Sequence, residues 1–323
     1  MGLSAFLCSG KKGDPALYVD IIGKKRAFLF DCGEININNS LIKRIDSIFI
    51  SHTHMDHFIG FDKIIRVSLP DEKEFNIYGP KGIIANVEGK LSGYTWNILD
   101  QVMLNIKVYE IEKNSIQEAF FKCKDGYKLK KGNKLKIENH LIYDDETLSV
   151  SFRELDHKTV SLAYSIHEKN SYNVNKEKLE EMKLNPGPWL GDLKHHVLND
   201  YDENTIITIG ENKYALNFLK KELLIQKKGS KITYITDAVY SKANITKIIE
   251  LGYNSNLFAC ETFFSVKDKE RAESTFHLTT EEAVKLFFAT ESLNFLPFHI
   301  SKRYRDAEKI MEEIKEFGVK RIK

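Results

Sequence analysis

The sequence has few features that would place the protein in a membrane or in an oxidising compartment. No apolar run approaches the roughly 18–20 residues that a membrane-spanning helix needs, and the N-terminus lacks the basic flank and apolar stretch of a signal peptide. The cysteines are few and widely separated: Cys8, Cys32, Cys123 and Cys260. Three of them lie in apolar strand-like runs, which favours buried free thiols over disulfides. We therefore expect a cytoplasmic protein that does not bind membranes.

The chain also has little net charge. It contains 48 Lys and Arg residues against 46 Asp and Glu residues, a formal net charge of +2. This balance does not identify a nucleic-acid-binding protein, so any such argument depends on local charge. The length of 323 residues allows a large core, and strands alternate with helices in much of the chain. We expect residues 1–323 to form a single α/β domain that carries an insertion.

The most informative stretch is S-H-T-H-M-D-H, residues 51–57, which directly follows an apolar run. This pattern predicts a buried strand that ends in a loop of functional side chains. His52 and His54 alternate, so both can point the same way from an extended chain, whereas Asp56 and His57 follow where the chain turns. Imidazole and carboxylate ligands together suit zinc, manganese or iron. An ordinary polar loop is the alternative, but we interpret the cluster as the start of a two-metal site, with ions roughly 3.5–4 Å apart.

Other apolar strands also end at residues that can bind metal. Three later strands are predicted to end at Asp237, Glu261 and His299, and His157 falls between two others. A lone His or Asp at a strand end is usually only a cap or a satisfied polar group. Binding sites of layered α/β folds nevertheless collect at strand ends, and the histidine cluster supplies a centre for them. We expect the ligands to be His52, His54, Asp56, His57, His157, Asp237 and His299, with the carboxylate of Asp237 as the bridge.

Residues 168–230 differ from the rest of the chain. They are polar, their lysines and acidic residues balance, and strands are predicted only at 205–209 and 214–219. We interpret this segment as an inserted arm. A second domain is the alternative, but the predicted ligands lie on both sides of the segment. Its most distinctive residues are Pro186, Gly187 and Pro188.

A basic hairpin is predicted around Gly132 and Asn133, because a Gly-Asn pair between two strand-like runs favours a tight turn. Its lysines are Lys128, Lys130, Lys131, Lys134 and Lys136. They could form a basic face for a polyanion. A solvated edge that lysines protect from pairing is the favoured alternative.

Several further motifs extend the pattern over most of the chain. They are F-D-C-G-E at 30–34, I-Y-G-P at 77–80, E-L-D-H at 154–157, N-P-G-P-W-L-G-D-L-K at 185–194, C-E-T-F-F at 260–264, F-H-L-T-T at 276–280 and H-I-S-K-R-Y at 299–304. Together with the histidine cluster, they resemble the metallo-β-lactamase superfamily, a four-layer αββα sandwich. More narrowly, the sequence is similar to ribonuclease Z, the tRNA 3′-processing endonuclease.

The resemblance implies a division of the ligands between two zinc ions, with Mn²⁺ or Fe²⁺ as alternatives. One ion would be held by His52, His54 and His157. The other would be held by Asp56, His57 and His299, and Asp237 would bridge the two. The resemblance also implies that the inserted segment is an arm that grips precursor tRNA, and that the protein forms a homodimer.

We expect metal-assisted hydrolysis of a phosphodiester. Asp56 would orient the attacking water and accept its proton, His277 would protonate the leaving oxygen, and Glu261 would orient His277. Ser301 and Arg303 would hold the phosphate. The alternatives are a structural role for His277 and a capped helix start at Ser301. A phosphodiesterase or other hydrolase of the same fold with a non-tRNA substrate is the alternative function. A non-catalytic binding protein is a third, which the intact ligand set disfavours.

Overall fold

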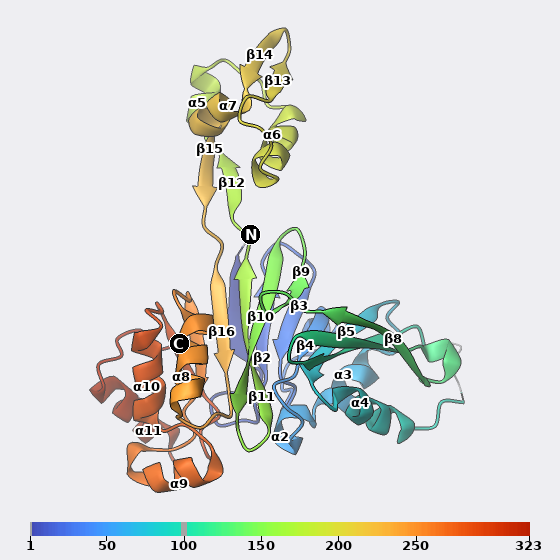
Figure 1. The fold of residues 1–323 in the computed structure, drawn as a ribbon, viewed down its shortest axis with the longest axis vertical. Helices are drawn as coiled ribbons and strands as arrows, with labels where there is room; N and C mark the ends of the chain where they lie inside the picture. The colour runs from blue at the N-terminus through green and yellow to red at the C-terminus, as the bar shows by residue number, and fades with distance from the viewer. Residues whose placement is uncertain (1, 98–101) are drawn as a thin grey trace. The chain divides into compact units, whose positions relative to one another are not determined.

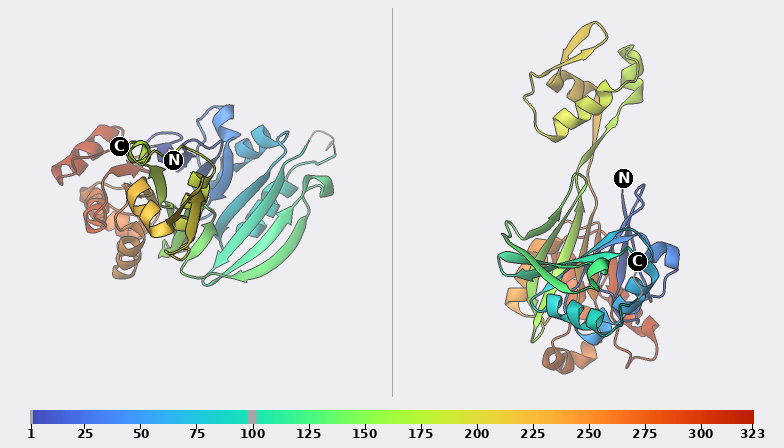
Figure 2. Two further views of the ribbon diagram at one scale, coloured as in Figure 1. Left: turned by 90° about the horizontal axis from the view of Figure 1, so that it is seen from above. Right: turned by 90° about the vertical axis from the view of Figure 1, so that its right-hand side faces the viewer.

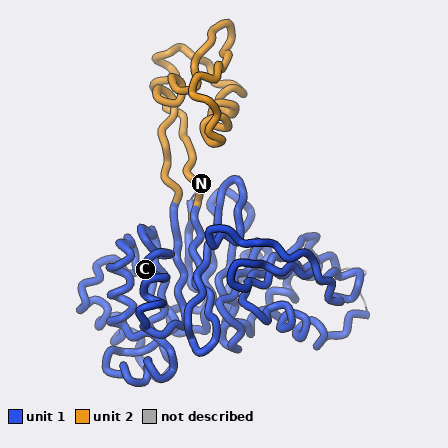
Figure 3. Tube along the Cα trace, in the orientation of Figure 1, with its two compact units in different colours: residues 1–167, 230–323 blue, residues 168–229 orange. Residues whose placement is uncertain are grey.

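The computed structural model describes residues 2–97 and 102–323 of the chain. Two compact units are present, one of Met1–His167 with Ser230–Lys323 and the other of Glu168–Gly229 (Figure 3). The second unit spans nearly the same residues as the insertion predicted over 168–230. In the part of the chain that the structure describes, no helix is long and apolar enough to cross a membrane. The cysteines are free as predicted, and all except the half-buried Cys123 are buried.

The first sheet of the larger unit has eight strands that follow one another in chain order (Figure 1). They are β1 (Leu3–Leu7), β2 (Leu17–Ile21), β3 (Ala27–Phe30), β4 (Ile45–Phe49), β5 (Glu74–Pro80), β6 (Asn105–Glu112), β7 (Ser115–Phe121) and β8 (Leu129–Lys136). Strands β3 to β6 are parallel. Parallel neighbours need crossover connections, and these contain helices α1 (Asn39–Ile42), α3 (Phe61–Ser68) and α4 (Ile83–Ser92).

The second sheet has six strands in the order β18-β17-β16-β11-β10-β9. They are β9 (Leu141–Asp144), β10 (Leu148–Asp156), β11 (Val160–Glu168), β16 (Lys231–Ile235), β17 (Leu257–Glu261) and β18 (Phe295–Phe298). Strands β16, β17 and β18 are parallel. Their crossovers contain α8 (Lys242–Gly252), α9 (Lys269–Thr275) and α10 (Thr280–Ala289), and α11 (Ala307–Glu316) follows the last strand.

Side-chain alternation along the strands builds the layers. In β3, Phe28 and Phe30 point into a core shared by both sheets, whereas Ala27 and Leu29 belong to a core beneath the N-terminal helices. Residues of β17 likewise divide between the shared core and a third core that includes residues of α8, α10 and α11. Figures 1 and 2 show these C-terminal helices, orange to red, and the N-terminal helices, blue to cyan, on different sides of the paired sheets. The predicted four-layer αββα sandwich is therefore confirmed.

The smaller unit has its own apolar core. Its elements are β12 (Ser171–Val174), α5 (Lys176–Glu181), α6 (Trp189–Leu198), β13 (Ile206–Ile209), β14 (Asn212–Ala215), α7 (Leu216–Leu223) and β15 (Leu224–Lys227). The strand predicted over 214–219 is wrong beyond its first two residues, because Leu216, Leu219 and Leu223 recur at helical spacing and pack into this core. Pro188 occupies the N-cap position of α6, so the Pro186-Gly187-Pro188 motif leads into that helix.

The predicted basic hairpin is also wrong. Lys130 to Lys136 belong to one strand, β8, which pairs with β7 along its length and has an irregular register near its middle. Gly132 lies at this irregularity rather than in a turn. A Cβ atom on Gly132 would lie 2.5 Å from the ring of Phe120 and 2.9 Å from Cβ of Glu118. The glycine therefore permits close approach of β7 side chains. In the sequence alone, a glycine with this role looks the same as a glycine in a turn.

Candidate metal centre

The histidine-rich turn follows β4 and leads into the short helix α2 (Met55–Phe58). His54 is the N-cap residue of α2 and has an extended backbone, and Asp56 and His57 lie in the helical turn itself. His52 and His54 therefore share one side of the chain, with Nε2 of His52 2.8 Å from Nδ1 of His54. Helical φ and ψ angles then carry Asp56 and His57 around to a second position beside the first.

Three other strand ends reach the same place. Asp237 follows β16, His299 follows β18, and His157 lies in the turn between β10 and β11. Because β16 and β18 run parallel to the same neighbour, β17, their carboxyl ends lie at one edge of the sheet. All three side chains are buried.

The backbone turns sharply at these strand ends. Asp31, Asp237 and His299 have left-handed φ angles of 55°, 47° and 55°. This conformation costs a residue other than glycine on the order of 1–2 kcal/mol, and Asp and His tolerate it better than most residues. The packed sheets thus hold three side chains in positions that an extended strand would not give them.

Three groups of described residues could hold a metal ion, and within each group the candidate ligand atoms lie within 4.8 Å of one another. One of them, Asp237, Glu261, His277 and His299, includes the predicted acid–base pair; the other two contain the predicted ligands. These two are His52, His54, His157 and Asp237, and Asp56, His57 and His299. Asp237 contacts both: its Oδ2 is 3.2 Å from Nε2 of His157 and 3.4 Å from Nε2 of His57, and its Oδ1 is 3.0 Å from Nδ1 of His299. The structure thus brings together all seven residues that the sequence predicts as ligands, with Asp237 between the groups.

The donor set fits divalent metal ions. Among the described residues, the buried Nε2 of His57 and Nδ1 of His299 have no hydrogen-bond partner. Carboxylate oxygens lie 3.0–3.5 Å from these nitrogens, close enough for an ion pair but poorly aligned for a hydrogen bond. Unpartnered buried nitrogens are rare in folded proteins. Imidazole and carboxylate groups arranged in this way are compatible with metal binding.

Asp31 holds His57 in place through a hydrogen bond on the side of the ring away from Asp237. Its Oδ2 is 2.9 Å from Nδ1 of His57 and accepts hydrogen bonds from the hydroxyls of Ser51 (2.7 Å) and Tyr234 (2.8 Å). Its Oδ1 accepts the backbone N–H of Ser51 at 2.6 Å. A carboxylate bound to one imidazole nitrogen fixes the ring and leaves the other nitrogen for a metal. Here that second nitrogen, Nε2 of His57, faces Asp237.

The charges of the cluster are tightly coupled. Burial, together with nearby His57, lowers the pKa of His52 to about 2, which favours the neutral ring. Burial also opposes charge on His57 and His299, but Asp237 outweighs it, with Asp31 assisting at His57. The pKa of His57 is therefore raised well above its ordinary value, and that of His299 is raised to about 9. Cations bound here would take the place of those protons beside the carboxylates.

His277 lies next to the two ligand groups. Its Nδ1 is 2.8 Å from Oε2 of Glu261, and Phe263 stacks on its ring with centroids 3.9 Å apart. Burial disfavours the charged ring, but Glu261 outweighs it and raises the pKa of His277. His157 is held nearby, with its Nδ1 2.7 Å from the carbonyl oxygen of Phe276. The predicted pairing of His277 with Glu261 is thus present, and a raised pKa favours the protonated ring, which is the form that can donate a proton.

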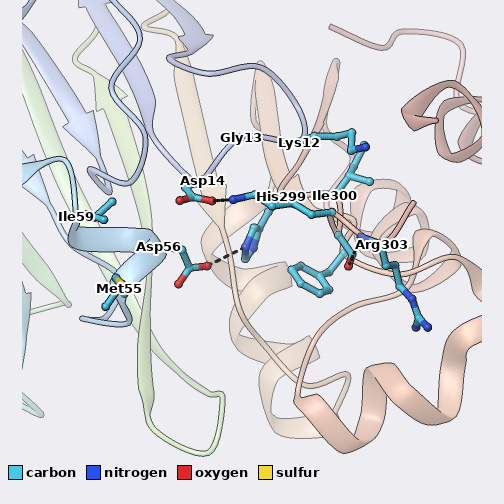
Figure 4. Close-up of a pocket in the computed structure, with 12 residues that line it drawn as sticks. Lys12, Gly13, Asp14, Met55, Asp56, Ile59, His299, Ile300 and Arg303 are labelled. Atoms are coloured by element: carbon cyan, nitrogen blue, oxygen red, sulfur yellow. Dashed lines mark hydrogen bonds and ion pairs between the residues drawn. The ribbon is translucent and has the colours of Figure 1, made fainter. Parts of the chain in front are cut away.

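A cavity of about 370 Å³ opens beside Asp56 and His299 (Figure 4). Ser301 and Arg303, the residues predicted to hold a phosphate, are among those that line it. Figure 4 shows Arg303 extending away from Asp56, and its Nη1 lies 3.4 Å from Oδ1 of Asp268. The guanidinium would have to exchange this carboxylate for a phosphate in order to bind substrate.

No role was predicted from the sequence for several residues that build the site. A Cβ atom on Gly33 would lie 2.0 Å from the backbone oxygen of Asp56, so the turn after β3 packs directly on α2. Lys12 and Lys302 line the same cavity, and Nζ of Lys302 is 2.5 Å from Oδ1 of Asp14. The turn after β3 could have been found from the sequence, because β3 is parallel to β4 and the turns that follow the two strands therefore lie at the same edge of the sheet. Nothing local marks the two lysines, because they come from opposite ends of the chain.

The chain resembles known proteins over nearly its whole length, although no protein-family model matches it. It is 26% identical over 312 residues to ribonuclease Z of Deinococcus radiodurans, an alignment that covers 95% of this chain and 92% of the relative. It is 28% identical over 298 residues to ribonuclease Z of Nanoarchaeum equitans, covering 90% of this chain and 78% of the relative.

Solved structures give the class of the fold. Human short-form tRNase Z superposes with a TM-score of 0.54 at 18% identity, covering 94% of this chain and 92% of the other. The metallo-β-lactamase-fold protein YhfI of Bacillus subtilis gives 0.56 at 12% identity, covering 100% and 95%. The chain therefore has a metallo-β-lactamase fold. Within that class its sequence relatives are ribonuclease Z proteins, and the resemblance predicted from the sequence is confirmed.

Proposed function

We propose that this protein is a metal-dependent phosphodiesterase of the ribonuclease Z type, an endonuclease that removes the 3′ trailer of precursor tRNA. The observation that carries the proposal is the convergence of seven side chains, from distant strand ends, into two ligand groups that meet at Asp237. The named relatives supply the substrate class, because they are called ribonuclease Z.

Two Zn²⁺ ions are the proposed cofactors. His52, His54 and His157 would hold one ion, and Asp56, His57 and His299 the other, with Asp237 shared between them. When bound, such ions lower the pKa of water and neutralise charge on phosphate oxygens. Mn²⁺ and Fe²⁺ suit the same donors and are the alternatives.

The remaining chemistry falls to side chains around the ligand groups. Asp56 is half-exposed at the cavity, where a free carboxylate oxygen can orient the attacking water and accept its proton. His277 would donate a proton to the leaving 3′-oxygen, with Glu261 holding its other nitrogen and Phe263 fixing the plane of the ring. Ser301 would donate a hydrogen bond to the phosphate.

The second unit, residues 168–229, is the proposed tRNA-binding arm. It contains ten lysines and ten acidic residues, so net charge does not explain how it would bind RNA. The Pro186-Gly187-Pro188 turn ahead of α6 is the segment proposed to contact the substrate, because its backbone is rigid and largely exposed. We further propose a homodimer in which each arm serves the partner's site.

The test compares two substrates. A precursor tRNA with a 3′ trailer should be cut after the discriminator base, and bis-p-nitrophenyl phosphate should be hydrolysed at the same centre. His54→Ala should lose bound metal and both activities, whereas His140→Ala, which removes an exposed histidine, should keep them. Hydrolysis of the small ester without cleavage of precursor tRNA would leave a phosphodiesterase with another substrate. If the His54→Ala variant retained both activities, the proposed metal centre would be refuted.

A further inference from the structure

One segment of the chain carries a strong local excess of positive over negative charge. Residues 122–136 contain seven of the 48 basic residues but only one of the 46 acidic residues, Asp125. The remainder of the chain therefore has 41 basic and 45 acidic residues and is slightly negative. This segment ends in β8, at the edge of the eight-stranded sheet.

Three of these lysines lie in a row on one face of the sheet. In the β7–β8 ladder, Lys136 is opposite Ser115, Lys134 is opposite Gln117, and Lys131 is opposite Ala119. Residues opposite one another in an antiparallel ladder point to the same face. Ala119 belongs to the core beneath the N-terminal helices, so this is the face of the sheet that those helices cover. We call Lys131, Lys134 and Lys136 the β8 lysine row.

The row is available to an anionic partner. All three lysines are exposed. Within the described ranges, Lys131 and Lys134 form no ion pair, and Lys136 has only Glu138 at 3.5 Å, with both side chains more than three-quarters exposed. An exposed pair of this kind contributes little and exchanges readily. Lys134 and Lys136 are alternate residues of one strand and so lie roughly 7 Å apart, and Lys131 follows on the same face beyond the register irregularity.

We infer that the β8 lysine row is a second RNA-binding surface, which contacts the phosphate backbone of the substrate and contributes affinity without base specificity. The inference rests on the proposed function for its choice of partner. Charge complementarity favours a polyanion, and the chain already has a centre suited to phosphodiesters. Lysine contacts of this kind position a nucleic acid but do not select sequence.

Edge protection is the competing explanation, since lysines on an edge strand also discourage pairing with other chains. The two explanations differ in the sign of the charge that the side chains must carry. Edge protection requires a charge of either sign, whereas phosphate binding requires a positive one. They also differ in salt dependence, because each neutralised phosphate adds about 0.7–0.9 to the slope of log affinity against log salt concentration.

The experiment measures kcat/KM for precursor tRNA between 50 and 200 mM KCl, with bis-p-nitrophenyl phosphate as the reference substrate. The variants replace the whole row with Gln, Glu or Arg. The matched control replaces Lys309, Lys315 and Lys320 with Gln; these are also exposed, but lie on or just after α11. The Gln and Glu row variants should lower the salt slope by about 2–3 and weaken RNA cleavage most at low salt. The Arg variant and the α11 control should keep the slope.

The outcomes separate the inference from the proposed function. Hydrolysis of the small ester should be unchanged in every variant, which shows that the centre is intact. An unchanged salt slope in the Gln and Glu variants, or an equal fall in the α11 control, would overturn the inference while leaving the proposed function standing. Failure of the unmodified protein to cut precursor tRNA would instead overturn the proposed function.

Discussion

Replacement of Asp31 by Asn should weaken metal binding without unfolding the protein. The carboxylate accepts four hydrogen bonds, three at Oδ2 and one at Oδ1. The amide of Asn has the same shape but only one oxygen that can accept hydrogen bonds. Its NH₂ group would face a hydrogen-bond donor that Asp31 now satisfies. Loss of the carboxylate that orients a ligand histidine typically costs 10–100-fold in metal affinity. At about 1.4 kcal/mol for each factor of ten, this corresponds to about 1.4–2.8 kcal/mol.

The assay is hydrolysis of bis-p-nitrophenyl phosphate in a series of chelator-buffered zinc concentrations. The midpoint of activation should move to 10–100-fold higher free zinc, and saturating zinc should restore most of the activity. Tyr234→Phe is the matched control, because it removes one of the four hydrogen bonds and leaves the charge; it should shift the midpoint by less than tenfold. A midpoint within threefold of the unmodified protein, or an equal effect in Tyr234→Phe, would refute the role assigned to Asp31.

Three other changes test different parts of the structure. Gly33→Ala inserts a methyl group against a backbone oxygen of α2 and should lower the free energy of unfolding by about 1–3 kcal/mol, whereas Gly89→Ala, where the added Cβ meets no atom within 4 Å, should not destabilise the protein; urea denaturation distinguishes them. Glu261→Gln removes the main cause that raises the pKa of His277. Since a general acid is active only while protonated, the alkaline limb of the pH–rate profile should move to lower pH, and an unmoved limb would contradict the assigned role. Deletion of residues 168–229 should impair cleavage of precursor tRNA but spare the small ester; equal loss of both would contradict the arm.

The candidate metal-binding loop could be predicted from the sequence because its residues lie close together in the chain. His52, His54, Asp56 and His57 lie within six residues of one another, and the strand that precedes them is visible as an apolar run. Asp237 and His299, which are more distant candidate ligands, could be placed beside this loop only because parallel strands bring their carboxyl ends together, which is a property of the fold class. The role of Asp31 could not be predicted in this way, since it depends on a hydrogen bond from Tyr234, 203 residues away.

The errors came from signals with more than one physical cause. Glycine at position 132 resembles a hairpin turn, but here it leaves space for the ring of Phe120 and for Glu118. The stretch predicted as a strand over 214–219 contains leucines whose helical spacing becomes decisive only when residues up to Leu223 are included. In both places, the neighbours that decide the conformation lie outside the window from which the prediction was made.

The left-handed residues at three strand ends carry a cost that has an evolutionary consequence. Asp31, Asp237 and His299 occupy an unfavourable backbone conformation whether or not a cation is bound. The folded chain therefore carries a conformational cost at the candidate site that selection for activity would maintain. A descendant that abandoned the reaction would gain stability by accepting glycine at these positions. In relatives that lose the activity, we therefore expect substitutions at the turns that end the strands before substitutions in the sheets themselves.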